Sequence, residues 1–197
     1  MKTPKVLPIV WASDLLFHQS KITDPSPLLI HFLVMAANII CANVLIEGEN
    51  IDLGTSNIFQ PHVRIVQESG AGPIIIGNSN IFEECVTITN SSLNTMHIGS
   101  NNLFNTGSVV QAEFIGDNCI ISPKAIIGSG SLIQSDCVIG PKCTVPSNQN
   151  ISQGTLIYGK DHISRKMAQS SGSVASLQSK HIDYLVQVLP KYHQIRK

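Results

Sequence analysis

The chain has 197 residues and a formal net charge of zero, with 43% hydrophobic and 13% charged residues. It is long enough for one sizeable core, and its hydrophobic share excludes an intrinsically disordered chain. The zero net charge argues against nucleic acid as the main partner. Nine acidic and three basic residues lie in 40–157, whereas 158–197 carries seven basic and two acidic ones. This division suggests that a basic tail docks on an acidic body, or that the two ends meet different partners.

Residues 1–34 are predicted to be an N-terminal extension outside the core, because they lack the repeat that organises the rest of the chain. A membrane span over 28–46 is disfavoured, since His31 and Asn38 interrupt a stretch that has to be apolar for about 20 residues. A signal peptide is disfavoured because the apolar run near the start is short and contains Pro8.

An aliphatic residue recurs at every sixth position toward the middle and end of the chain. The series is Ile115, Ile121, Ile127, Ile133, Ile139, Val145, Ile151 and Ile157. A six-residue period fits neither a helix nor an alternating strand, but it is the period of a hexapeptide parallel β-helix. Residues 35–160 are therefore predicted to form an all-β, single-stranded, left-handed parallel β-helix of about six coils.

Upstream, the same spacing holds within groups of residues and breaks between them. The breaks fall between Ile46 and Leu53, Ile65 and Ile76, Ile88 and Ile98, and Val110 and Ile115. If three hexads make one turn of a triangular prism, every break falls after the third strand of a coil. All the irregular segments, including 66–75 and 89–97, are therefore predicted to lie on one edge of the prism.

Small and polar residues occupy the places where the chain has to turn. Asn57, Asn80 and Asn102 follow repeat residues at a constant spacing, so their side chains are expected to hydrogen-bond along a column.

The five cysteines are odd in number and lack a CxxC spacing, which disfavours a zinc ribbon or a disulfide framework. Cys119, Cys137 and Cys143 occupy a position of the repeat that favours small, inward-facing side chains, so buried free thiols are expected there.

After the repeat stops, residues 161–175 are predicted to be a linker, and 176–197 a C-terminal α-helix with a tail. Leu177, Tyr184 and Leu185 belong to an apolar row with helical spacing, and Pro190 is expected to end or kink the helix. We favour a helix that lies along one face of the prism or across its end. Binding of its apolar face to a partner remains the alternative.

Prisms of this type host two main enzyme classes, and the sequence offers little for either. A zinc site of the γ-carbonic-anhydrase kind needs three histidines, but the predicted coils contain only His62 and His97. A hexapeptide acyltransferase needs one histidine base beside a long loop, for which His97 beside 90–96 is the candidate. We predict no catalytic, metal-binding or cofactor-binding residue, so the chain is expected to be an interaction module rather than an enzyme.

Several runs of residues resemble a known family. They are AGPIIIGNSNIFEE (71–84), IIGSGSLIQSDCVIGPKCTV (126–145), TLIYGKDHISRKMA (155–168) and YLVQVLPKYHQIRK (184–197). Together they are similar to the dynactin subunit 6 family, and the helix that ends in LPKYH is the most specific of them. The resemblance covers roughly residues 36–197, but the insertion at 89–97 is shorter than is usual in the family.

The resemblance implies a non-catalytic scaffold subunit of the dynactin pointed-end complex, beside dynactin subunit 5 and the other pointed-end subunits. Such a subunit supports dynein-driven microtubule transport and cargo attachment, and is cytoplasmic and cytoskeleton-associated. A γ-carbonic-anhydrase-like or acyltransferase enzyme is the alternative. No cofactor, nucleic acid, membrane span or small-molecule substrate is expected. The candidate partner-binding residues are Glu68, Pro73, Asn94, Met96, Tyr184, Leu185, Leu189, Tyr192 and His193.

Overall fold

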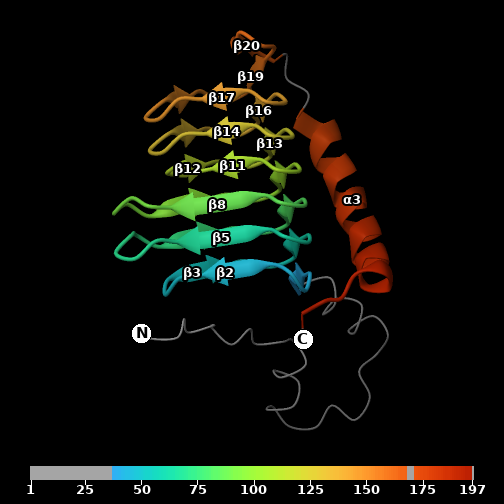
Figure 1. Ribbon diagram of the computed structural model, residues 1–197. Coiled ribbons are helices and arrows are strands. Elements are labelled where there is room, and N and C mark those ends of the chain that lie inside the picture. Colours follow the sequence, from blue (N-terminus) through green and yellow to red (C-terminus); the bar gives the residue numbers. More distant parts are fainter. Residues whose placement is uncertain (1–36, 168–170, 197) are drawn as a thin grey trace, which may run out of the picture.

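A three-sided column of stacked parallel strands, with one long helix beside it, makes up the described part of the molecule (Figure 1). The computed structural model describes residues 37–167 and 171–196. The predicted extension at 1–34 lies outside the described residues. The described strands form one eight-stranded and two six-stranded sheets, here called sheets I, II and III. The predicted left-handed parallel β-helix of about six coils is confirmed.

Sheet I contains the first strand of each triplet and a final hairpin strand. In stacking order its strands are β1 (Ile39–Ile40), β4 (Ile58–Phe59), β7 (Ile81–Phe82), β10 (Leu103–Phe104), β13 (Ile120–Ile121), β16 (Val138–Ile139), β19 (Thr155–Tyr158) and β20 (Ile163–Lys166). All neighbours are parallel except β19 and β20, which are antiparallel.

Sheets II and III form the other two sides, and all of their strands are parallel. Sheet II contains β2 (Leu45–Glu47), β5 (Arg64–Gln67), β8 (Thr87–Asn90), β11 (Val109–Val110), β14 (Ile126–Ile127) and β17 (Thr144–Val145). Sheet III contains β3 (Ile51–Leu53), β6 (Ile74–Ile76), β9 (Met96–Ile98), β12 (Phe114–Ile115), β15 (Leu132–Ile133) and β18 (Asn150–Ile151).

The register of the strands explains the six-residue period. Ile121 pairs with Ile139, and Ile139 pairs with Ile157, so three hexads separate one coil from the next. The repeat residue of each strand points inward, and nearly all of them are buried in one continuous core. Ile46, Leu53 and Ile151 are only partly buried because they belong to end strands that have a neighbour on one side.

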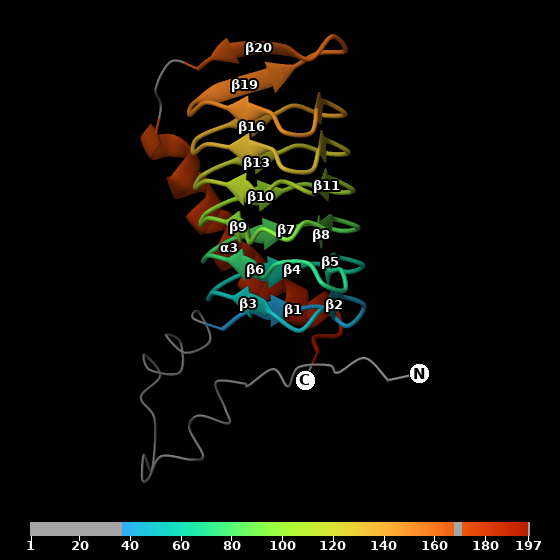
Figure 2. The same ribbon diagram turned by 90° about the vertical axis from the view of Figure 1, so that its left-hand side faces the viewer.

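The spacing breaks all fall between a strand of sheet II and the following strand of sheet III. The loops that follow β2, β5 and β8 therefore stack on one edge, here called the II/III edge, which faces the viewer in Figure 2. The prediction of a single irregular edge is confirmed. The strands that flank these longer loops have three or four residues, whereas those of the later coils have two.

Two columns of side chains run through the first coils. Asn80 donates from its Nδ2 to Asn57 Oδ1 (3.0 Å), and its own Oδ1 accepts from the Asn102 backbone N (2.9 Å). The predicted hydrogen-bonded asparagine column is thus present. On the inner face of sheet I, the ring of Phe82 stacks on those of Phe59 and Phe104, with centroids 4.8 and 4.7 Å apart.

Helix α3 (Ser171–Tyr192) runs along the outer face of sheet I, as Figures 1 and 2 show from two sides. The side chains of Ile182, Leu185 and Leu189 join the core, and Gln178 Nε2 donates to the Ser79 carbonyl (3.4 Å). Of the two places predicted for this helix, along one face of the prism or across its end, the structure shows the first. The outward Ile58 and Ile81 of sheet I are fully buried, whereas Ile126 of sheet II stays 46% exposed.

The segment before α3 differs from the predicted linker at 161–175. Residues Ile163–Lys166 form strand β20 because the free edge of β19 supplies hydrogen-bonding partners. The helix begins at Ser171, since helix propagates from its packed part into residues of weak propensity. It also continues two residues past Pro190, whose missing N–H costs little this close to the end.

Both ends of sheet I are covered by the chain itself. At one end β20 pairs with β19. At the other, Ala42 N donates to Gln194 O (2.7 Å) and Arg196 N donates to Ile40 O (2.8 Å), so the C-terminal tail forms a bridge along β1. These contacts satisfy strand groups that would otherwise present an open edge.

Candidate interaction surfaces

Two loops project from the II/III edge, one between β5 and β6 and one between β8 and β9. The first is organised by Gln67, the last residue of β5. Its Oε1 accepts from the backbone N of Glu49 and of Asn50, each at 2.9 Å. Its Nε2 donates to the carbonyls of Ala71 (2.9 Å) and Gly72 (3.1 Å). One side chain therefore fixes this loop and ties it to the turn below.

Asn90, the last residue of β8, has the same place one coil higher and pairs with Gln67 in register. Its Nδ2 donates to the carbonyls of Gly72 and Asn94, each at 2.9 Å. The loops touch so closely that a Cβ added to Gly72 would lie 2.4 Å from Asn94 O. The edge is therefore a stack of loops held by amide side chains.

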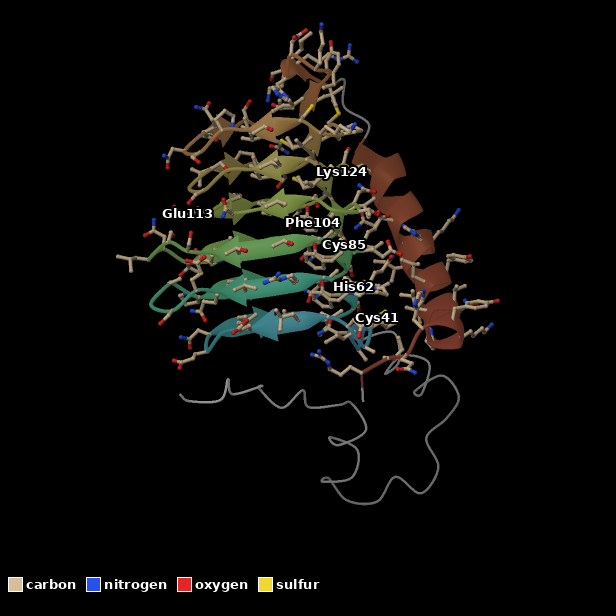
Figure 3. All side chains as sticks on the ribbon, in the orientation of Figure 1. Cys41, His62, Cys85, Phe104, Glu113 and Lys124 are labelled. Carbon is tan, nitrogen blue, oxygen red and sulfur yellow. The ribbon has the colours of Figure 1, made fainter. Side chains whose placement is uncertain are left out.

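The predicted edge residues divide into exposed and buried ones. Glu68, Pro73 and Asn94 are exposed. The Nδ2 of Asn94 donates to Oε2 of Glu113 (3.0 Å), and Figure 3 shows Glu113 at this edge. Met96 is only 1% exposed, so its prediction as a partner-binding residue is corrected. In the three-residue strand β9, residues 96 and 98 point inward and only His97 points outward.

Sequence reasoning missed both the organisers of this edge and its most exposed apolar side chain. Leu93, in the second loop, is 86% exposed. Gln67 and Asn90 each follow an inward repeat residue by two places, just before an insertion, and this spacing is the signal that could have identified them. The edge is also acidic: Glu47, Glu49 and Glu68 are all exposed.

The C-terminal residues also divide. Leu185 and Leu189 are buried against sheet I, so they pack within the chain and are not available to a partner. Tyr184 and Tyr192 are 60% and 77% exposed, and His193 is exposed as well. These three remain candidates for contact with another protein.

The histidines among the described residues do not gather into a site. His97 lies exposed on the outer face of sheet III between Ile75 and Phe114, and His62 lies at the corner between sheets I and II with a positive φ of 64°. Within residues 37–167 and 171–196, no three His, Cys, Asp or Glu side chains come close enough together to hold a metal ion. The only described helix, α3, lacks the long apolar stretch that crossing a bilayer requires.

All five cysteines are free thiols, and only Cys85 is exposed. Cys119 and Cys137 continue the asparagine column upward, and their Sγ atoms donate to the carbonyls of Gln134 (3.3 Å) and Ser152 (3.4 Å). The hydrogen bond with Cys137 and burial both raise the pKa of the Cys119 thiol, which keeps it neutral. The expectation of small buried thiols is confirmed for the three cysteines in the inward slot, Cys119, Cys137 and Cys143.

Comparison with known proteins adds to this geometry. A dynactin subunit 6 from Nematostella vectensis is 38% identical over 173 residues, covering 82% of this chain and 90% of the relative. A dynactin subunit 6 from Xenopus tropicalis is 35% identical over 170 residues, covering 81% of each chain. The chain belongs to the dynactin subunit 6 family. No family model matches it.

The family assignment therefore rests on identity over most of the chain, and it agrees with the resemblance found in the sequence. Among solved structures, a UDP-N-acetylglucosamine acyltransferase from Bacteroides fragilis is 15% identical. The superposition covers 82% of this chain and 87% of the acyltransferase, with a TM-score of 0.42.

Proposed function

We propose that the chain is a non-catalytic scaffold subunit of dynactin. The observation that carries the proposal is the identity of 38% and 35% with relatives named dynactin subunit 6, over more than four-fifths of this chain. In finer detail, it belongs to the pointed-end complex, beside dynactin subunit 5, in the cytoplasm and associated with the cytoskeleton. It thereby supports dynein-driven microtubule transport and cargo attachment.

The physical basis of this role is a stiff body with preformed surfaces. The loops of the II/III edge are held by Gln67 and Asn90, and the ends of sheet I are covered by β20 and by the tail. Such a body loses little conformational freedom on binding, so the surfaces available to partners need not be ordered first. Exposed Leu93, Tyr184 and Tyr192 supply apolar and aromatic contact area of the kind found in protein interfaces.

Affinity purification of the tagged full chain from cells, followed by identification of the proteins recovered, tests the proposal. Recovery of dynactin subunits, subunit 5 among them, supports it. Recovery of none, from cells in which a tagged known dynactin subunit recovers the complex, overturns it.

A second measurement addresses the enzymatic alternative. Purified chain is incubated with acetyl-CoA and a set of amine and hydroxyl acceptors, and with CO₂ in a hydration assay. Turnover that is lost in His97→Asn would contradict a non-catalytic role, because His97 is the one candidate base that the sequence offers.

A further inference from the structure

The corner between sheets I and II is here called the I/II corner. In each of several consecutive coils it contains one residue whose backbone has the left-handed conformation, with a positive φ. Those residues are His62, Cys85, Gly107, Lys124 and Lys142. The corner between sheets III and I uses Ser56, Ser79, Asn101, Asn118, Asp136 and Gly154 in the same way. Glycine adopts this conformation without strain and asparagine and aspartate adopt it often, whereas in other residues the Cβ lies close to the following carbonyl oxygen. Lys124 and Lys142 are the two lysines among these corner residues.

Lys124 and Lys142 also lie one directly above the other. They are three places after Ile121 and Ile139, which pair in register, and Lys142 N donates to Pro123 O (3.0 Å). Successive coils are about 4.8 Å apart, so the backbone brings two lysines to neighbouring positions on one corner, where side chains of like charge disfavour each other. Lys160 follows Ile157 at the same interval, in the turn after β19.

Nothing in the described part of the chain neutralises these charges. Lys124, Lys142 and Lys160 are exposed, and no ion pair forms between them and any carboxylate of residues 37–167 or 178–196. Residues 168–177 contain neither Asp nor Glu. In Figure 3, Lys124 lies above Cys85 and His62 in one column, on the opposite side of the solenoid from Glu113.

We propose that these three residues, the lysine corner, dock a row of carboxylates on a helix of a neighbouring dynactin subunit. This inference rests on the proposed function. Carboxylates at positions i, i+3 or i+4 and i+7 of a helix are about 5–6 Å apart, which matches the rise of the coils. The left-handed backbone of the lysines and the repulsion between neighbouring like charges both raise the free energy of the unbound chain. A partner of opposite charge removes the second of these costs.

The shape of the corner favours a protein partner over nucleic acid or an anionic membrane. The row is one residue wide, whereas nucleic-acid and membrane binding use broad basic fields. Glu83 and Glu84 lie on the same corner two coils below Lys124, and they would repel an extended polyanion. A short acidic helix meets the lysines without reaching these carboxylates.

The test compares four full-length, tagged chains by recovery of dynactin subunits from cells. They are the wild type, the reversal Lys124→Glu/Lys142→Glu/Lys160→Glu, the charge-preserving Lys124→Arg/Lys142→Arg/Lys160→Arg, and a matched reversal elsewhere, Arg64→Glu/Lys180→Glu/Lys191→Glu. We expect the corner reversal to lower recovery roughly tenfold, while the other two variants stay within about twofold of the wild type. Circular dichroism and thermal melting of the purified variants check that each is folded.

Each outcome decides one question. A corner reversal that is folded and recovers dynactin as the wild type does overturns the lysine corner, as does an equal loss in the matched reversal. Wild-type chain that recovers no dynactin subunit overturns the proposed function instead. Loss of binding to phosphatidylserine vesicles or duplex DNA, with dynactin recovery unchanged, assigns the corner to a different partner and also overturns the inference.

Discussion

The lower part of the solenoid, residues 39–110, and the upper part, residues 114–158, have the same triangular plan but are stabilised differently. In the lower part, asparagines fill one column and stacked phenylalanines fill sheet I. In the upper part, Cys119 and Cys137 continue the asparagine column, and isoleucines replace the phenylalanines. Only the lower part carries insertions at the II/III edge, and its Ser79 carbonyl accepts a hydrogen bond from Gln178 of α3.

The difference shows what an insertion requires in a fold of this kind. Each extra loop brings backbone N–H and C=O groups that no neighbouring coil matches, and these groups need partners. Gln67 and Asn90 provide partners for both loops. The upper part keeps an unbroken six-residue spacing from Ile115 to Ile157, so its strands pair with the coil above or below without such help.

The two parts meet at Asn102. Its Oδ1 accepts from Cys119 N (2.7 Å), but its Nδ2 is buried without a hydrogen-bond partner. Asn57 and Asn80, by contrast, donate to the carbonyls of Gly77 and Gly99 one coil above. The asparagine column therefore ends with one unsatisfied donor where the thiols begin.

The largest effect that separates the two parts is expected in the phenylalanine stack. Phe82→Ala should lower the free energy of unfolding by about 4 kcal/mol, because it removes the central ring of three buried ones. Ile139→Ala, at the matching place in the upper part, should cost about 3 kcal/mol. Urea denaturation of both variants measures the difference. A Phe82→Ala cost below that of Ile139→Ala would contradict a special role for the stack.

The asparagine column should show the next largest effect. Asn80→Ala leaves Asn102 N without its acceptor and removes both side-chain donations of Asn80, so we expect a loss of about 3 kcal/mol. Cys137→Ala removes one weak thiol donor from the same column and should cost about 1 kcal/mol. Equal costs in thermal and urea unfolding would show that amide and thiol are interchangeable here.

The edge loops permit a more local test. Gln67→Ala removes four hydrogen bonds and should cost about 2 kcal/mol. Hydrogen exchange should speed up at the amides of Glu49 and Asn50, which lose their acceptor. Gln149→Ala is the matched control, since Gln149 is exposed at the same edge of the upper part and its side chain makes no hydrogen bond within the described residues. Unchanged exchange in Gln67→Ala would mean that the loops are held in another way.

The smallest effect concerns reactivity rather than stability. A thiol reagent such as Ellman's reagent should modify one thiol per native chain, at Cys85, and five after unfolding, because the other four cysteines are buried. In Cys85→Ser the native count should fall to zero. Rapid reaction of a second thiol in the native protein would show that the core opens readily around the column.

Much of the architecture could be predicted because the period and its breaks are local properties of the sequence. The spacing of Ile121, Ile139 and Ile157 specifies three hexads per coil, and the four breaks specify a single irregular edge. The candidate surface could be predicted only in outline. Glu68 and Asn94 are exposed as expected, but Met96 is buried, because a strand of three residues turns its first residue inward.

The sequence by itself determined the repeat, the number of coils and the asparagine column, since each follows from residue types at fixed intervals. Only the tertiary structure decided that Ile163–Lys166 pairs with β19 and that Leu185 and Leu189 pack within the chain. These outcomes depend on which edges and faces remain available once the coils have stacked. Contacts between distant segments determine which edges and faces remain available, and no local sequence pattern encodes those contacts.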